Sequence, residues 1–296
     1  MSSPDLHEAN RHSWNAATAA HNSHKADQAA FLRRGGTTLF AEEVELLGDV
    51  TGKRLCHLQC NSGQDTLSIA STLGAKATGV DISDEAIRFA QRLSEDSGIP
   101  ATFHRTDVYD YLGEVEPSSF DTVFLSYGAL CWLSDLDRWA TGVARLMRPG
   151  GRLVIVEFHP CMMVFDMDLR ARYDGIRVTD QAAEFPEGIG DYVGRSGEAL
   201  TPMGRRAGVS DFDNPHPSYE WTWSTAGLTT VILAAGLRLQ TLRDWPHVNG
   251  WKGVHQDGTA VGPSVHDSKG LSQASDDARP GRGQADLTNI RFNNTV

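Results

Sequence analysis

A short apolar run passes into a helical segment through the turn Leu58-Gln59-Cys60-Asn61-Ser62-Gly63-Gln64-Asp65-Thr66. A tight turn between the carboxyl end of a strand and a helix is the place where open parallel sheets bind ligands. The single glycine of the turn, Gly63, allows a ligand to approach the backbone closely. Because the dinucleotide pattern Gly-x-Gly-x-x-Gly is absent, the turn disfavours a pyrophosphate ligand.

The alternation of apolar and helical segments extends from about residue 50 to residue 160. Short apolar runs separated by helical periods are typical of a parallel sheet with helices on its faces. The strand candidates are residues 53–58, 76–80, 101–104, 120–126 and 151–158. The last two are apolar along most of their length, as strands covered on both faces are. We therefore expect an α/β fold, doubly wound and Rossmann-like, around a mostly parallel sheet.

Two helices of this region have clear end signals. Ser83 can cap a helix whose first turn carries two acidic residues and which Gly98 and Pro100 end. Asp135 precedes a second helix, in which residues 136–147 place apolar side chains on one face at helical spacing.

Outside residues 50–160 the pattern changes. The N-terminal part contains two helical pieces, about 6–20 and 37–47, around a break at residues 33–36. The C-terminal 50 residues are rich in Gly, Ser, Asp and Asn and have few apolar positions, so they can bury little surface. We expect five segments: a helical cap (1–49), an α/β core (50–160), an inserted lid (161–216), a return to the core (217–246) and an extended or disordered tail (247–296).

The composition excludes several classes of protein. The 296 residues include 27 Lys and Arg against 38 Asp and Glu, a formal net charge of -11. With no surplus of positive charge to neutralise phosphates, binding to nucleic acid or to an anionic membrane is not expected. No run approaches the length of a membrane span, and residues 1–10 lack the apolar stretch of a signal peptide. The four cysteines form neither a disulfide framework nor a zinc pattern, so we expect a soluble cytoplasmic protein.

Acidic residues follow two further strand candidates. Asp81 lies in Val80-Asp81-Ile82-Ser83, where a carboxylate suits the two hydroxyls of a ribose. Asp107, after the third strand candidate, is placed to accept from an adenine amino group. As simpler alternatives, Asp81 caps the following helix and Asp107 is a turn residue. Together with the first turn, on three successive strand ends, the two acids favour a ligand that carries a nucleoside.

These motifs resemble those of class I S-adenosylmethionine-dependent methyltransferases, over about residues 10–245. The turn of the form Gln-Cys-x-x-Gly-Gln-Asp-Thr is similar to a bacterial branch of the family, in which it replaces the usual glycine-rich loop. Gln59 and Asn61 stand where the family has glycines, and His57 stands at the usual acidic position. The resemblance rests on residues 55–66, 80–83, 105–108, 120–126 and Arg148-Pro149-Gly150-Gly151.

The resemblance implies S-adenosylmethionine as the cofactor and a sheet of seven strands. It implies that Asp81 with Ile82 contacts the ribose and that Asp107 with the Val108 amide contacts the adenine. The final strand of the family is antiparallel, and only residues 287–292 offer a weak candidate for it.

The other half of the cofactor is expected near the first turn and the fourth strand. The resemblance implies that the methionine part and the transferred methyl lie beside Ser126 and Tyr127. The side chains of Gln59 and Asn61 can supply hydrogen bonds that the common loop supplies from its backbone. The cofactor contacts expected in the first turn are Gln59, Asn61, Gly63 and Gln64.

Candidates for a catalytic base follow the fifth strand, in Glu157-Phe158-His159-Pro160. Methyl transfer is an in-line displacement from a sulfonium carbon, so the protein supplies mainly alignment and a dry cavity. An acceptor that must lose a proton also needs a nearby base, and Glu157 or His159 at this strand end can face the substrate. Otherwise Glu157 is buried with a partner between helix and sheet, and His159 is a turn residue ordered by Pro160.

The N-terminal segment and residues 219–223 supply candidate substrate contacts. In similar methyltransferases the N-terminal region folds over the cofactor, which would place Trp14 or His21 in the active site. With no evident third partner for its histidines, a metal is not expected. Tyr219 and Trp221 alternate at strand period, which indicates an aromatic face and a pocket for a bulky apolar molecule. Packing within a helix or under a lid is the alternative for all these aromatic residues.

The sequence therefore predicts a methyltransferase that uses S-adenosylmethionine and acts on a small organic acceptor in specialised metabolism. Oxygen or nitrogen methylation is the first expectation. Carbon methylation of an electron-rich ring or alkene is the second, with aromatic faces stabilising a carbocation. A third is a non-catalytic module that binds S-adenosylmethionine. No protein-docking domain is evident, and the oligomeric state stays open, a homo-oligomer included.

Overall fold

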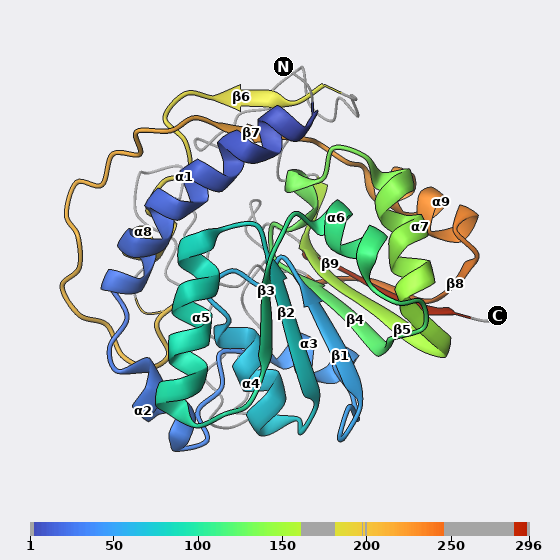
Figure 1. Cartoon of the computed structure of the whole chain (residues 1–296), viewed down its shortest axis with the longest axis horizontal. Coiled ribbons are helices and arrows are strands. Elements are labelled where there is room, and N and C mark those ends of the chain that lie inside the picture. Colours follow the sequence, from blue (N-terminus) through green and yellow to red (C-terminus); the bar gives the residue numbers. More distant parts are fainter. Residues whose placement is uncertain (1–2, 161–180, 197, 199, 246–286, 295–296) are drawn as a thin grey trace, which may run out of the picture.

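A seven-stranded sheet forms the centre of the molecule (Figure 1). The structure is a computed structural model that describes residues 3–160, 181–196, 198, 200–245 and 287–294. The strands lie in the order β3-β2-β1-β4-β5-β9-β8, and β1 to β5 are parallel. Their bounds are β1 (Arg54–Leu58), β2 (Lys76–Asp81), β3 (Thr102–Arg105), β4 (Phe120–Ser126), β5 (Met147–Phe158), β8 (Leu237–Trp245) and β9 (Leu287–Asn294). The prediction of a doubly wound, mostly parallel sheet is confirmed.

Helices cover both faces of this sheet because its central strands are apolar on both faces. Val123 and Leu125 of β4 pack in one cluster with Trp139, whereas Phe124 between them packs in another with Leu47. This alternation follows from the two-residue period of a strand. The first face is covered by α6 (Val108–Glu114), α7 (Leu136–Leu146) and α9 (Thr225–Ala234), the second by α3 (Ala41–Leu47), α4 (Gln64–Thr72) and α5 (Asp84–Ser97). Ser83 and Asp135 cap α5 and α7 as predicted.

The strand β9 confirms residues 287–292 as the final antiparallel strand, for which the sequence offered only a weak candidate. It pairs antiparallel with β5 on one side and with β8 on the other, so residues 287–294 belong to the sheet rather than to a tail. A few alternating residues suffice for such a strand when both neighbours supply backbone partners. The rest of the expected tail, residues 246–286 and 295–296, lies outside the described residues.

A cap of helices and a small second sheet lies over the carboxyl ends of the parallel strands. The helix α1 (Ser3–Ser23) crosses those ends and packs against α5 and β7 (Figure 1). The second sheet pairs β6 (Ala183–Phe185) with β7 (Ser218–Glu220), and the short helix α8 (Tyr192–Arg195) lies between them in the chain. Of the expected lid insertion, residues 161–180 lie outside the described residues.

The N-terminal region also differs from the expected pair of helices. It forms α1, α3 and, between them, α2 (Gln28–Arg33), which the sequence did not indicate. Asp27 caps α2 by accepting from the Ala30 amide, and Leu32 anchors it in the cluster beneath α5. A six-residue helix shows too little period to be recognised from sequence, because its stability comes from this packing.

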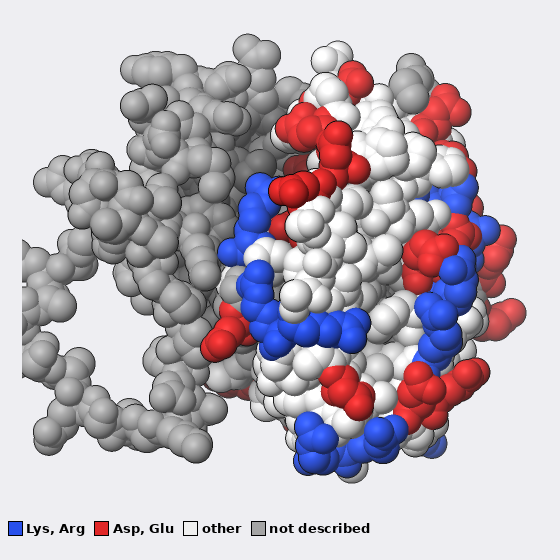
Figure 2. All heavy atoms as spheres, turned by 90° about the vertical axis from the view of Figure 1, so that its left-hand side faces the viewer, with Lys and Arg blue, Asp and Glu red and all other residues white. Residues whose placement is uncertain are grey.

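The surface over α1, α2, α5 and α8 mixes the two signs of charge. Figure 2 shows acidic and basic side chains interspersed on the described part of this face, without a continuous basic area. Among the described residues, no helix combines the length and the apolar character needed to cross a membrane.

Candidate active site

A cavity of about 670 Å³ lies between the carboxyl ends of the parallel strands and the cap. Fourteen of the sixteen residues expected in the site line it, and Gly63 and Tyr219 are the two that do not. The fourteen are Trp14, His21, Gln59, Asn61, Gln64, Asp81, Ile82, Asp107, Val108, Ser126, Tyr127, Glu157, His159 and Trp221. Parallel strands bring their ends to one edge of the sheet, which explains why residues far apart in sequence meet here.

The first turn adopts backbone conformations that glycine usually provides. Gln59 has φ 55° and Asn61 has φ 48°, both in the left-handed region. Gln59 donates from Nε2 to the Ala129 carbonyl at 2.8 Å, and the Asn61 amide donates to Asp81 Oδ2 at 2.8 Å. These contacts hold the turn in a shape that a glycine-rich loop reaches without side chains.

The structure shows a packing reason for the glycine at position 63. Gly63 has φ 76°, and a Cβ added there would lie 2.6 Å from the Cβ of Ala90. The glycine is therefore required by the close packing of α4 against α5, not by the approach of a ligand. The neighbouring Gln64 donates to Asn22 and to Gln28, which ties α4 to the cap.

Asp81 is the buried acid at the end of β2. Its oxygens accept from the amides of Asn61 and Ser83, at 2.8 and 2.9 Å. Burial raises its pKa to about 6, because loss of water disfavours the charged carboxylate. Each carboxylate oxygen has two lone pairs, so both oxygens can still accept from a ligand hydroxyl.

Asp107 at the end of β3 has a protein partner that the sequence did not reveal. Its Oδ1 accepts from the Tyr109 amide and caps α6, and its Oδ2 lies 2.8 Å from Nδ1 of His7. The His7 ring stacks on Tyr109, with ring centroids 5.5 Å apart, and meets Trp221 edge-on. The first turn of α1 is thereby docked on the strand end where adenine is expected.

Two further acids that the sequence did not indicate, Asp65 and Glu43, lie close together, and Asp65 lies beside Lys25. Asp65 accepts from the Thr38 hydroxyl, and its charge acts on Lys25, whose pKa burial lowers to about 8. Burial and the nearby Asp65 charge raise the pKa of Glu43 well above its usual value. His57 stands at the position where the family usually has an acid, but it carries no charge, because burial lowers its pKa to about 3 and keeps the ring neutral.

Glu157, expected as a catalytic base, is engaged by the backbone. Its carboxylate accepts from the amides of Gly128, Ala129, Leu130 and Phe158. Three of these donors, Gly128, Ala129 and Leu130, belong to the turn after β4. The carboxylate of Glu157 therefore holds that turn in place. Burial raises its pKa, while these hydrogen bonds act in the opposite direction.

His159 and Tyr127 lie where β5 and β4 open into the cavity. His159 Nε2 is 3.8 Å from Asp244 Oδ1 at the end of β8, close enough for an ion pair when the imidazole is protonated. Tyr127 has φ 38° and its ring meets Phe40 and Phe158, so a bend at the end of β4 directs it into an aromatic wall.

The cap side of the cavity is aromatic. Trp14 meets Trp132, His21 and Tyr192 edge-on, with centroids 5.4 to 6.5 Å apart. His21 is neutral at pH 7, because burial lowers its pKa to about 4, and its Nε2 lies 3.0 Å from the Gly190 carbonyl. Together with Trp132, for which the sequence indicated a place in the core, these rings form an aromatic wall on the cap side of the cavity.

Tyr219 is a correction to the expected aromatic face of residues 219–223. Its hydroxyl lies 3.3 Å from Glu184 Oε1 on β6, so its side chain points away from the cavity. The strand β7 ends at Glu220, so the two-residue alternation assumed for Tyr219 and Trp221 does not continue. Trp221 lines the cavity and Tyr219 does not.

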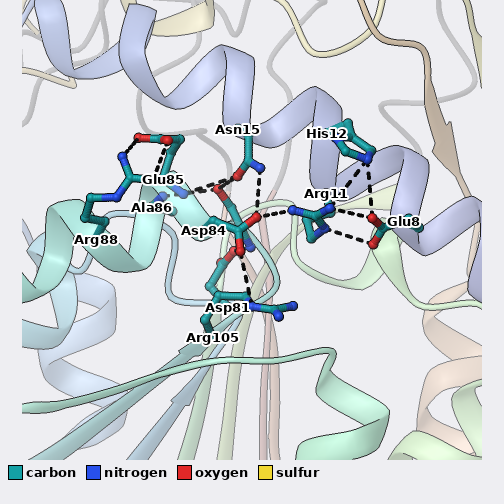
Figure 3. A network of polar contacts seen from close by, with 11 residues as sticks. Glu8, Arg11, His12, Asn15, Asp81, Asp84, Glu85, Ala86, Arg88 and Arg105 are labelled. Carbon is teal, nitrogen blue, oxygen red and sulfur yellow. Dashed lines mark hydrogen bonds and ion pairs between the residues drawn. The ribbon is translucent and has the colours of Figure 1, made fainter.

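The cap is fastened to the sheet near Asp81 by polar contacts between α1 and the first turn of α5. Figure 3 shows Asn15 and Arg11 of α1 directed at Asp84. Asn15 donates to Asp84 and accepts from the Ser83 hydroxyl and the Glu85 amide, at 2.7 to 3.2 Å. We call these contacts the α1–α5 latch, and they close the cavity over the end of β2.

Comparison with known proteins identifies the class of this fold. Residues 56–151 match the family model described as a methyltransferase domain. An S-adenosylmethionine-dependent methyltransferase from Methanosarcina mazei has a similar structure, with a TM-score of 0.52 at 15% identity, over 87% of this chain and 99% of that one. Residues 56–151 therefore resemble a methyltransferase domain, and the chain has the Rossmann-like fold of the class I methyltransferases.

Curated relatives match a shorter stretch. The 27-O-demethylrifamycin SV methyltransferase of Amycolatopsis mediterranei is 29% identical over 145 residues, 47% of this chain and 50% of that protein. A ubiquinone biosynthesis O-methyltransferase of Xanthomonas euvesicatoria is 31% identical over 114 residues, 38% of this chain and 46% of that protein. The chain thus spans about half the length of the curated relatives it matches.

Proposed function

We propose that the protein transfers a methyl group from S-adenosylmethionine to a small organic acceptor. The observation that carries this proposal is the meeting of Asp81 and Asp107, from two neighbouring strand ends, in one cavity of a methyltransferase domain. The likeness to a rifamycin methyltransferase supports a role in specialised metabolism, and the largely aromatic cap side supports a bulky apolar acceptor.

The residues of the cavity fit this cofactor chemically. Three buried polar atoms among the described cavity residues lack a hydrogen-bond partner: His7 Nε2, His21 Nδ1 and Gln59 Oε1. Unsatisfied buried groups are rare in folded proteins, so a polar ligand accounts for them. The proposed nucleoside contacts are Asp81 with Ile82 at the ribose and Asp107 with Val108 at the adenine.

The amino-acid end of the cofactor carries one positive and one negative group, and the cavity offers both complements. We assign its carboxylate to Lys25 and its ammonium to Asp65, which lie close enough to influence each other's charge. This pair takes the role of the acid that is missing at His57. Gln59, Asn61, Ser126 and Tyr127 complete the same half of the site.

In the proposed reaction the protein mainly aligns and excludes water. When bound, the cofactor supplies an electrophilic methyl group on a sulfonium centre. Glu157 holds the turn after β4 through three amides of that turn, so it sets the wall beside the transferred methyl. His159 at the end of β5 is the proposed proton acceptor. The latched α1 covers the cavity and keeps it dry.

Calorimetry with S-adenosylmethionine and with S-adenosylhomocysteine tests the proposal. We expect micromolar binding of both, and Asp81→Ala should weaken binding at least about a hundredfold because two charged hydrogen bonds are lost. Asp81→Asn keeps one acceptor oxygen and checks that the turn still folds, and Asp49→Ala at an exposed site serves as the control. Wild-type protein that binds neither compound would refute the proposal.

A further inference from the structure

One carboxyl group of the cavity has no partner and no role so far. Glu220, the last residue of β7, lines the cavity, and its side chain makes no hydrogen bond to the residues that the structure describes. Burial raises its pKa, and no described cation or hydrogen bond counteracts that effect. Its side chain is half-buried, so a ligand that fills the cavity would take water away from the carboxylate and would have to supply its hydrogen bonds instead.

The other acids of the cavity differ from Glu220 in this respect. Asp81 and Asp107 accept from backbone amides, and Glu157 accepts from four of them. Asp65 accepts from a hydroxyl and lies beside a lysine. Each of these carboxylates has a structural partner in the described chain, whereas Glu220 has none there.

The backbone on both sides of Glu220 is held firmly. Asn10 of α1 donates to the Tyr219 carbonyl at 2.8 Å and accepts from the Tyr219 amide at 2.7 Å. The Trp221 amide donates to the Cys131 carbonyl at 2.8 Å, next to the turn that Glu157 organises. Glu220 is therefore presented to the cavity from a fixed backbone, as a recognition group is.

We place Glu220 on the acceptor side of the cavity, because the next residue, Trp221, donates its amide to Cys131, which follows the end of β4, and the charge of Glu220 acts on Cys131. Lys25 is the only lysine or arginine among the described cavity residues, and Asp65 is the charged group that acts on it. The acceptor side therefore carries negative charge and aromatic rings, without a described lysine or arginine.

We propose that Glu220 selects the acceptor by binding its N–H or O–H donor, and that the acceptor is an apolar ring compound that is not an anion. This inference rests on the proposed function and names the chemical class of its second substrate. A protonated amine gains a charge-assisted hydrogen bond and the attraction of the rings. A hydroxyl gains the hydrogen bond alone, and a carboxylate is repelled.

Three naphthalene probes of equal size test this selection. They are 2-(1-naphthyl)ethylamine, 2-(1-naphthyl)ethanol and the carboxylate 1-naphthaleneacetate, which share a ring and differ in the polar end group. Calorimetry uses the full chain saturated with S-adenosylhomocysteine at about pH 8, where the amine is still protonated. We expect the amine to bind at least about tenfold more tightly than the carboxylate, with the alcohol between them.

The variant Glu220→Gln isolates the charge, because it keeps the shape of the side chain. We expect it to lose about tenfold in amine affinity while alcohol and S-adenosylhomocysteine bind as before. Glu187→Gln, at an exposed site outside the cavity, should behave like wild type. We also expect Glu220→Gln to melt no lower than wild type, because the Glu220 side chain makes no hydrogen bond or ion pair to the described residues that the amide would lose.

The outcomes separate this inference from the proposed function. If S-adenosylhomocysteine does not bind, the proposed function fails. If it binds and the carboxylate probe binds as tightly as the amine, or the variant keeps the amine preference, the selection by Glu220 is wrong. If none of the three naphthalene probes binds detectably at about 1 mM, the proposal that the acceptor is an apolar ring compound is wrong. A lower melting temperature of Glu220→Gln overturns the recognition role in favour of a structural one.

Discussion

At the scale of single residues, the pKa of Lys25 links cofactor binding to pH. Burial lowers this pKa to about 8, so the free protein loses the ammonium charge as pH rises through 8. A bound carboxylate would favour the charged form and raise the pKa in the complex. Binding then takes up protons above pH 8, and the affinity must fall as pH rises there.

We expect the Kd of S-adenosylhomocysteine to be nearly constant below about pH 7 and to rise above pH 8 by up to about tenfold per pH unit. Calorimetry from pH 6 to about pH 9.5 measures it. 5′-Methylthioadenosine, which lacks the amino-acid end, should show no such rise. Lys25→Met should weaken the binding of S-adenosylhomocysteine at low pH and flatten the dependence of its Kd on pH. Lys53→Met, at an exposed site, should change neither. Equal profiles for the two ligands would contradict the assignment.

The residues of the site were more predictable the closer they lie to the parallel strands. Asp81 and Asp107 follow apolar runs, and parallel topology alone brings such ends together. Lys25, His7 and Glu220 come from the cap, where no periodic pattern tells which residue will face the sheet. Their role depends on how α1 and β7 dock, and a single sequence holds no local signal for that.

At the scale of elements, the α1–α5 latch should set how fast the cavity opens. Asn15 makes three hydrogen bonds to the first turn of α5, beside Asp81 (Figure 3). We expect Asn15→Ala to speed the dissociation of S-adenosylhomocysteine by up to about a hundredfold, because three hydrogen bonds of about 1 kcal/mol each are lost. Stopped-flow fluorescence measures the rate. Ala19→Ser, at an exposed position of the same helix, should leave it unchanged, and an unchanged rate in Asn15→Ala would rule out the latch as a gate.

The helices and strands of the core were predictable because local and tertiary preferences agree there. Ser83 and Gly98 bound α5 as their chemistry requires. The exception is β5, which begins at Met147, before the Pro149-Gly150-Gly151 run that indicates a turn. A shift in the register between β4 and β5 absorbs that run, and pairing with β4 sustains the strand on both sides of it.

At the scale of the whole molecule, the sheet depends on β9. This strand is the sole link through which β8 joins the sheet in the described chain. Removing residues 287–296 should lower the melting temperature by more than about 10 °C, because β5 and β8 lose a full ladder of backbone partners. Calorimetric melting checks this, with removal of residues 295–296 alone as the control. Equal melting of the two truncated chains would show that β9 is dispensable.

The position of β9 also bears on how the chain folds as it is made. A ribosome releases β1 to β5 and then β8 well before β9, which comes after all of them in sequence. Until β9 emerges, one side of β5 is an open edge that a neighbouring nascent chain can pair with. The protein is therefore most exposed to aggregation late in translation, and a chaperone that shields this edge would raise the yield of native protein more than one acting on the first hundred residues.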